Sequence, residues 1–254
     1  MILEIEHIWL FLLILPVISF LYSSVGHGGA SGYLALMSLF SFPHLVMKPT
    51  ALLLNLFVAG ISFFYYFRGG FFKKKLFLYF ALASVPMSFL GGTIDLDATL
   101  YKKILAVLLI FAVLKMLNVF GPASPSGGKE STKIKDIKLW QGLLVGGAIG
   151  YFSGLIGIGG GIILSPIILL LHWGNMKEAA AVSALFIWVN SAAGLIGQLS
   201  NGVTLSTHSF GLVAIAIVGG IFGAYFGSKI VNNKTLRYVL AFVLVLASVK
   251  LFFI

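Results

Sequence analysis

The sequence predicts an all-α polytopic membrane protein made of two inverted-topology repeats, each with about five hydrophobic segments. Three observations support this prediction: the composition, the division of the chain into long apolar runs, and a correspondence between its two halves. Of the 254 residues, 59% are hydrophobic and only 9% are charged, whereas an ordinary soluble domain carries about 25% charged residues. So few charges cannot cover a water-facing surface, and this excludes a soluble globular enzyme.

Apolar segments divide the chain at regular intervals. A spanning helix needs roughly 20 apolar residues, so the length allows about ten segments and leaves no room for a soluble domain. The expected segments are 8–25, 29–42, 49–67, 76–93 and 101–119, followed by 140–156, 160–173, 178–199, 208–229 and 235–253. The first segment follows Glu4 and Glu6 instead of a basic region, so we interpret it as a retained helix and not as a secretory signal.

A polar linker separates the two halves. Residues 121–138 are rich in Gly, Pro, Ser and Lys, a composition typical of a flexible, hydrated connection. We therefore expect an N-terminal transmembrane repeat over 1–120, a flexible cytoplasmic linker over 121–138 and a C-terminal transmembrane repeat over 139–254.

The halves also correspond in their residues. Gly26, Gly28 and Gly29 match Gly157, Gly159 and Gly160 at a separation of 131; Lys48 and Ser62 match Lys177 and Ser191 at 129; Gly92 and Lys115 match Gly227 and Lys250 at 135. Because the order of short and long segments is the same in both halves, we interpret the chain as an internal duplication.

Basic residues predict the orientation. Arg68 and residues 73–75 follow the third segment, and basic loops lie on the cytoplasmic side of a membrane. Alternation then places 13 basic residues inside and four outside. Each half has an odd number of segments, so the halves enter the membrane from opposite sides. The short segments 29–42 and 160–173 leave open whether 8–42 and 140–173 are full crossings or re-entrant hairpins.

Each half contains a glycine-rich turn between its first two segments. Residues 23–32 read Ser-Ser-Val-Gly-His-Gly-Gly-Ala-Ser-Gly, and residues 154–161 read Gly-Leu-Ile-Gly-Ile-Gly-Gly-Gly. Each glycine costs a helix about 1 kcal/mol relative to alanine, so both helices should break there. Backbone that leaves a helix inside a membrane must find partners or line a wet cavity. The free N–H groups that begin the next helix favour an anion, although glycines can also serve close helix packing.

The turns therefore predict a site for a small anion. Its expected backbone residues are Gly26, Gly28, Gly29, Gly157, Gly159, Gly160 and Gly161. His27 is the one ionisable side chain at a turn, and it would donate to the anion or carry a proton; otherwise it is a neutral histidine that reaches a carbonyl group. No acidic residue and no arginine falls in the middle of a segment. Anion selectivity would then rest on helix dipoles, backbone N–H groups and hydroxyls such as Ser31 and Ser165.

These residues resemble the TauE/SafE sulfite exporter family. The second half carries the pattern as Gly157-Ile158-Gly159-Gly160-Gly161, Ser165-Pro166, Lys177-Glu178-Ala179-Ala180 and Asn190-Ser191. The first half departs from it, with Ala30 for the third glycine and His27 inside the turn. The resemblance covers nearly the whole chain and implies transport of sulfite, organosulfonates or related sulfur oxyanions across a bacterial plasma membrane. It also places Asn190 and Ser191 at the site, while interhelical hydrogen bonding is the ordinary role for Asn55 and Gln198.

The function that we expect is a secondary transporter of sulfite, thiosulfate or organosulfonates that works by alternating access. Its partners would be the anion, the lipid bilayer and a coupling proton or sodium ion, without nucleic acid, metal, cofactor or catalytic residues. A passive anion channel would use the same turns. An intramembrane serine hydrolase is the weaker alternative: Gly29-Ala30-Ser31-Gly32 supplies Ser31 as nucleophile, but a histidine base must lie within hydrogen-bond reach of it.

Overall fold

The computed structural model describes residues 8–97, 99–100, 103–104, 106–107, 110, 114, 135–229 and 245. Most of the expected segments 101–119 and 235–253 and of the linker 121–138 lies outside the described residues, as do Lys115 and Lys250. The described elements are the helices α1 (Ile8–Ser23), α2 (Ala30–Leu39), α3 (His44–Arg68), α4 (Lys74–Thr93), α6 (Leu139–Ile156), α7 (Gly161–Leu170), α8 (Met176–Ser200) and α9 (Thr207–Lys229). Five of them, α3, α4, α6, α8 and α9, are long and apolar enough to cross a membrane. The prediction of an all-α polytopic membrane protein is confirmed.

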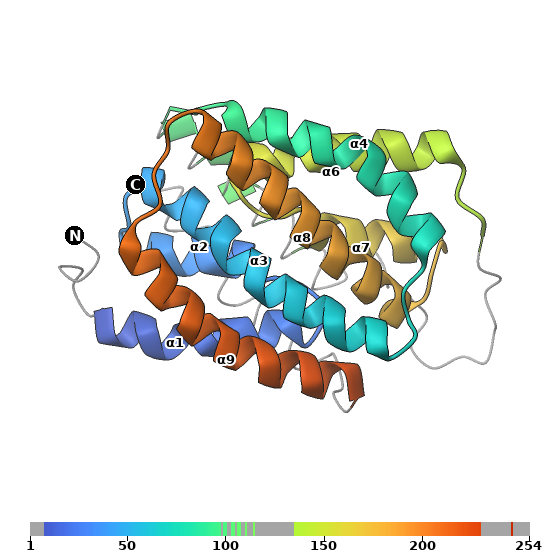
Figure 1. Ribbon diagram of the computed structural model, residues 1–254, viewed down its shortest axis with the longest axis horizontal. Helices are drawn as coiled ribbons and strands as arrows, with labels where there is room; N and C mark the ends of the chain where they lie inside the picture. Colours follow the sequence, from blue (N-terminus) through green and yellow to red (C-terminus); the bar gives the residue numbers. More distant parts are fainter. Residues whose placement is uncertain are drawn as a thin grey trace.

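Corresponding helices of the two halves, such as α3 and α8, run in opposite directions (Figure 1). At one end of the molecule α3 and α9 both begin, and Thr50 and Ser209 share a hydrogen bond of 2.9 Å there. At the other end α4 and α8 begin, and Lys73 pairs with Glu178 at 3.0 Å. The central helices α3 and α8 pack on each other, α1 packs along α9, and α4 packs along α6. Each half therefore completes its packing with helices of the other half.

Both glycine-containing pairs are hairpins that return to the side from which they started. The ring of Phe11, near the start of α1, lies 5.6 Å from that of Phe40, which follows α2. In the second half, the N–H of Lys135 donates to the carbonyl of His172 at 2.8 Å, which joins the residues before α6 to those after α7. The helices α2 and α7 have ten residues each, about 15 Å of helix, too short to cross the hydrocarbon. The question that the sequence left open is thus answered in favour of re-entrant hairpins.

Small residues bring the paired helices close together. On α6 a stripe of glycines meets the backbone or Cβ atoms of α4; its members are Gly142, Gly146, Gly150 and Gly154. On α9 a second stripe meets the backbone at α1 and just after it; its members are Gly219, Gly223 and Gly227. A methyl group at any of these positions would collide with the facing helix. In a membrane, such close approach replaces the hydrophobic effect as the main attraction between helices.

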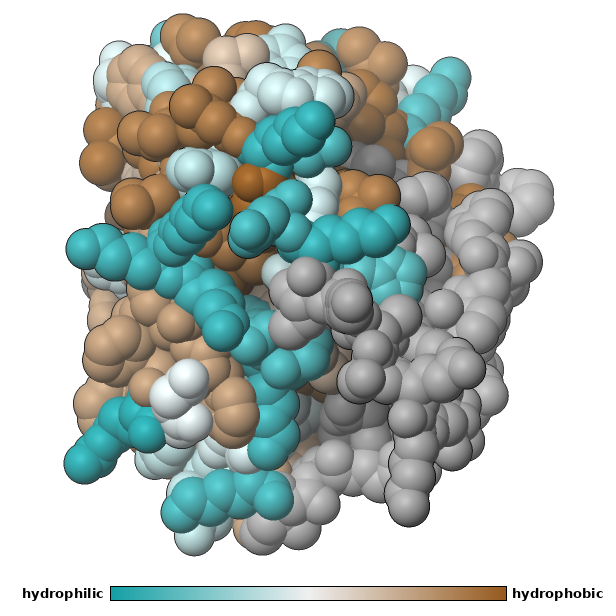
Figure 2. Space-filling model, turned by 90° about the vertical axis from the view of Figure 1, so that its right-hand side faces the viewer, coloured by the Kyte–Doolittle hydropathy of each residue, from teal (hydrophilic) through white to brown (hydrophobic). Residues whose placement is uncertain are grey.

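One end of the molecule carries most of the exposed basic residues that the structure describes. They are Arg68, Lys73, Lys74, Lys75, Lys135, Lys138, Lys177 and Lys229. Figure 2 looks onto this end, where hydrophilic side chains run in a band between hydrophobic surfaces. Basic residues gather on the cytoplasmic side of membrane proteins, so we place this basic end in the cytoplasm. At the opposite, outer end the described basic residues are Lys48, which is buried, and Lys103.

The expected helix boundaries differ most at α3. This helix begins at His44, five residues before the expected start at 49, and includes Lys48 and Pro49. The amides of Val46 and Met47 donate to the carbonyl of Pro43, which starts the helix ahead of the internal proline. Lys48 is therefore part of the membrane helix and not of the preceding loop.

Candidate functional site

The two glycine turns have a backbone conformation that requires glycine. In the first turn, between α1 and α2, Gly26 and Gly29 have φ angles of 77° and 102°; in the second, between α6 and α7, the φ angles of Gly157, Gly159 and Gly160 lie between 72° and 85°. Side chains other than glycine avoid this left-handed region. Gly29 and Gly160 directly precede the first residues of α2 and α7. The sequence prediction that both helices break at these glycines is confirmed.

The two turns meet at one side chain, Asn55 of α3. A Cβ built on Gly28 would collide with Asn55 Oδ1, and one built on Gly159 would collide with Asn55 Nδ2. The amide oxygen accepts from the N–H of Ala30 at 2.9 Å, and the amide nitrogen donates to Ser191 Oγ at 3.2 Å. Asn55 is fully buried and lies near the middle of its helix. A single carboxamide thus joins the hairpins of both halves deep inside the protein.

His27 extends from the first turn to the second hairpin. Its Nε2 lies 3.1 Å from the carbonyl oxygen of Gly161 and 3.1 Å from Ser165 Oγ. The Ser165 hydroxyl donates its own hydrogen to Ser183 Oγ at 2.7 Å. Both neighbours of Nε2 therefore act as acceptors, so this nitrogen carries the imidazole hydrogen. The result is a polar chain from the first turn through α7 to α8.

Comparisons with known proteins identify the family of this chain. The family model described as sulfite exporter TauE/SafE matches residues 10–251. The chain belongs to the TauE/SafE sulfite exporter family.

Relatives in this family carry similar names. The chain is 35% identical over 236 residues to a probable membrane transporter protein of Sinorhizobium fredii, with 92% of this chain and 94% of that protein covered. It is 28% identical over 174 residues to a probable membrane transporter protein of Methanocaldococcus jannaschii, with 64% and 62% covered. No solved structure matches. As a TauE/SafE protein, the chain is a multi-pass membrane transporter.

The residues that carry the TauE/SafE resemblance have different positions in the site. Ser165 contacts His27, Ala180 packs against Gly26, and Ser191 accepts from Asn55. The side chain of Asn190 lies elsewhere: its Nδ2 donates to Ser84 Oγ of α4 at 3.1 Å and to the carbonyl of Phe186 at 2.8 Å. The structure therefore brings Ser191 to the turns and places Asn190 at the interface between α8 and α4.

The Ser31 side chain, on α2, points toward α1 of its own hairpin. Its hydroxyl donates to the Tyr22 hydroxyl at 2.9 Å, whereas the Nε2 of His27 is bonded to α7. The serine–histidine pair that a hydrolase requires would have to join Ser31 to His27. The observed hydrogen bonds use each of these side chains in another way.

The sequence interpretation missed two residues of this candidate site. Asn55 was expected to make an ordinary interhelical hydrogen bond, yet it contacts both turns. Lys48 was counted with the outer loops, yet it is buried and its Cγ lies 3.0 Å from a Cβ built on Gly157. The available signal for Lys48 was its match to Lys177 in the other half; nothing in the sequence distinguished Asn55 from other intramembrane amides.

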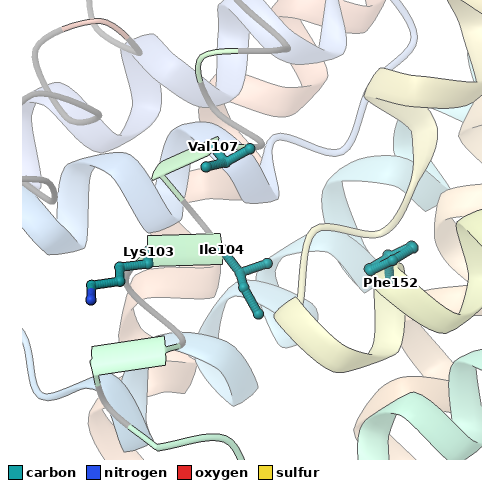
Figure 3. A pocket seen from close by; sticks show the side chains of 4 residues that line it. All are labelled: Lys103, Ile104, Val107 and Phe152. Atoms are coloured by element: carbon teal, nitrogen blue, oxygen red, sulfur yellow. The ribbon is translucent and has the colours of Figure 1, made fainter.

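A hollow of about 330 Å³ lies beside α6, separate from the glycine turns. It is lined by Lys103, Ile104, Val107 and Phe152, and Figure 3 shows Phe152 across the hollow from Ile104. The lining is apolar apart from Lys103 and includes no residue of the glycine turns. Its described lining therefore differs from the glycine turns, where several polar side chains come together. Among the described residues, no group of three or more His, Asp or Glu could hold a metal ion.

Proposed function

We propose that this chain is a secondary transporter of small sulfur-containing oxyanions, namely sulfite, thiosulfate or organosulfonates, in the bacterial plasma membrane. The observation that carries the proposal is the meeting of two oppositely oriented glycine turns at Asn55. Inverted-repeat transporters place their substrate where broken helices of both repeats meet near the middle of the membrane. The turns would form the substrate site together with His27 and Ser191, the two polar side chains named from the sequence that reach them.

The chemistry of the site suits an anion. The first amides of α7, at Gly161 and Ile162, have no acceptor within the helix, and the positive dipole end of a helix favours negative charge. Ser153 lies beside this helix start, its Cβ 3.5 Å from a Cβ built on Gly160, and its buried hydroxyl has no partner among the described residues. At α2, the N–H of Ala30 already donates to Asn55 Oδ1. We infer that an oxyanion oxygen takes the place of this carboxamide oxygen when substrate binds.

The hairpins also provide a route for alternating access. Each turn extends toward the end of the protein opposite to its own base: Gly26 packs on Ala180 near the start of α8, and Gly157 packs on Lys48 near the start of α3. The described turn residues are buried or half-buried, as expected of a state closed to both sides. A small rotation of one repeat against the other would then open the site to one side at a time.

His27 is the proposed proton carrier. An imidazole with an ordinary pKa near 6.5 changes its charge within the physiological range. Its Nε2–H, which is present in both the neutral and the charged imidazole, holds the first turn to α7. Protonation adds a positive charge beside the proposed anion site, which would strengthen anion binding and couple a proton to the anion.

The test is transport by the purified protein in proteoliposomes. We expect saturable uptake of labelled sulfite that thiosulfate competes with and that an imposed pH gradient drives. Counterflow, in which unlabelled sulfite on the far side accelerates uptake, would separate alternating access from a passive channel, since a channel gives none. Protein-free vesicles and a Gly70→Ala variant, whose added methyl has nothing within 4 Å, are the controls. Uptake no faster than in protein-free vesicles for all three substrate types would contradict the proposal.

A further inference from the structure

Lys48 is a buried cation whose hydrogen-bond partners are neutral. It is 8% exposed, and its Nζ donates to the carbonyl oxygens of Gly92 at 3.4 Å and Ile94 at 3.3 Å. Asp95, the residue after Ile94, is near enough to attract Lys48 electrostatically, but its carboxylate accepts from Asn201 Nδ2 at 3.1 Å. Within the part of the chain that the structure describes, no carboxylate forms a direct ion pair with Lys48. A buried charge without a directly paired counter-ion is costly, so its position beside a glycine turn calls for an explanation.

Lys177 is the counterpart of Lys48 in the other repeat. It is the second residue of α8, whereas Lys48 is the fifth of α3. The Nζ of Lys177 donates to the carbonyl of Ser228 at the end of α9 at 3.4 Å. Both lysines therefore bond the carbonyl end of the fourth helix of their own repeat, a favourable place for a cation. The duplication preserves this arrangement at the two opposite ends of the protein.

Lys48 also touches the hairpin tip of the other repeat, and Lys177 lies one helical turn from the residue that touches the first hairpin tip. The stem of Lys48 packs against Gly157 of the second turn. Gly26 of the first turn packs against Ala180, which lies one helical turn beyond Lys177. An anion that approached either turn from the nearer side of the membrane would thus pass one of these lysines first.

The two ends differ in how the positive charge is compensated. Lys177 is exposed and lies 4.8 Å from the ring centroid of Phe71, and it is followed by Glu178, which pairs with Lys73. Lys48 is buried and has no such acidic neighbour in the first turn of its helix. A buried charge is screened less by salt and water than an exposed one, so Lys48 should attract an anion more strongly.

We propose that Lys48 and Lys177 are the residues that draw the anion into the site, Lys48 from the outer side and Lys177 from the cytoplasmic side. This inference rests on the proposed function and adds a division of labour between the two faces. The neutral carbonyl contacts hold each ammonium group in place while no anion is present. The incoming anion then forms the direct ion pair that Lys48 lacks.

The test compares the two faces of the membrane in right-side-out and inside-out vesicles, with labelled thiosulfate as probe. Lys48→Gln is the informative variant, because the glutamine amide can still donate to the carbonyls of Gly92 and Ile94 but carries no charge. We expect it to raise the outer KM about tenfold and to leave the inner KM unchanged, while Lys48→Arg stays close to the parent chain. Lys177→Gln should raise the inner KM alone, by a smaller factor. Lys74→Gln, at the basic end but in contact with neither turn, controls for the general surface potential.

The outcomes separate the possible roles. If Lys48→Gln and Lys177→Gln leave both KM values unchanged while the parent chain transports thiosulfate, the lysines only cap helices and the inference is wrong. Equal changes on both faces would also overturn it. If the parent chain transports none of the three substrate types, the proposed function itself fails, and this is visible before any variant is measured. The melting temperature of each variant identifies loss of folding, and Lys48→Arg then decides between charge and packing.

Discussion

Gly159 offers a sharp test of the site, because alanine there adds one methyl group between the two hairpins. With a φ of 72°, alanine at this position is strained by its backbone alone. Its Cβ would also collide with Asn55 Nδ2 and lie 2.9 Å from Ile187 Cγ2 and 3.2 Å from Ser191 Oγ. Asn55 cannot swing away without breaking its hydrogen bonds to Ala30 and Ser191.

The expected cost has two parts, and the chain contains a control for the first. A left-handed conformation costs a residue with a Cβ roughly 1–2 kcal/mol. Overpacking of a tight interior adds about 1–3 kcal/mol. Gly70 has a similar φ of 75° but nothing within 4 Å of an added Cβ, so Gly70→Ala pays only the first part. Gly159→Ala should therefore be about 1–3 kcal/mol less stable than Gly70→Ala.

The assay is thermal unfolding in detergent together with uptake in proteoliposomes. For a chain of this size, 1 kcal/mol corresponds to a melting temperature change of about 2–4 °C. We expect Gly159→Ala to melt roughly 2–12 °C below Gly70→Ala and to lose most of its sulfite uptake, whereas Gly70→Ala transports at the parent rate. Equal melting temperatures and equal uptake for both variants would refute the packing of the turns around Asn55.

Three further substitutions test separate contacts. Asn55→Asp places a carboxylate where the oxyanion oxygen is proposed to bind, so uptake should fall at least about tenfold with the fold retained; unchanged uptake would contradict that position, and circular dichroism checks the fold. His27→Gln should remove the pH dependence of uptake between pH 5 and 8, as measured by initial rates at several pH values; a pH profile like that of the parent would exclude His27 as the proton carrier. Glu178→Gln removes the charge that pairs with Lys73 and should lower the free energy of unfolding by about 0.5–1 kcal/mol. The melting temperature measures this loss, and an unchanged value would show that the ion pair does not stabilise the protein.

The all-α membrane architecture could be predicted from the sequence because it depends on composition and on local patterns. Apolar runs mark the helices, lysines and arginines mark the cytoplasmic ends, and clustered glycines mark the places where a helix must break. The boundaries of α4, α6 and α9 differ from the expected ones by no more than two residues. At α3, the apolar run that begins at residue 49 predicted a later start than the helix has, since the carbonyl of Pro43 accepts the first bonds and Lys48 is included in the helix.

The site was less predictable because it depends on distances between residues far apart in the chain. The sequence named both glycine turns, but it did not say that Asn55 would lie between them. Asn190 and Ser191 are neighbours in sequence, yet adjacent residues of a helix point in different directions, and only Ser191 reaches the turns. The depth of Lys48 could not be read either, since a lysine near a helix end is usually drawn to the headgroups.

The interlocked packing of the helices bears on the origin of the duplication. Helix α1 packs along α9, and α6 packs along α4, so the second repeat alone would leave the glycine-lined faces of α6 and α9 uncovered. The same packing is available to two separate half-length chains only if they insert in opposite orientations and pair as an antiparallel dimer. Joining the halves in one chain allows each turn its own sequence, such as His27 in the first turn and a third glycine, Gly161, in the second.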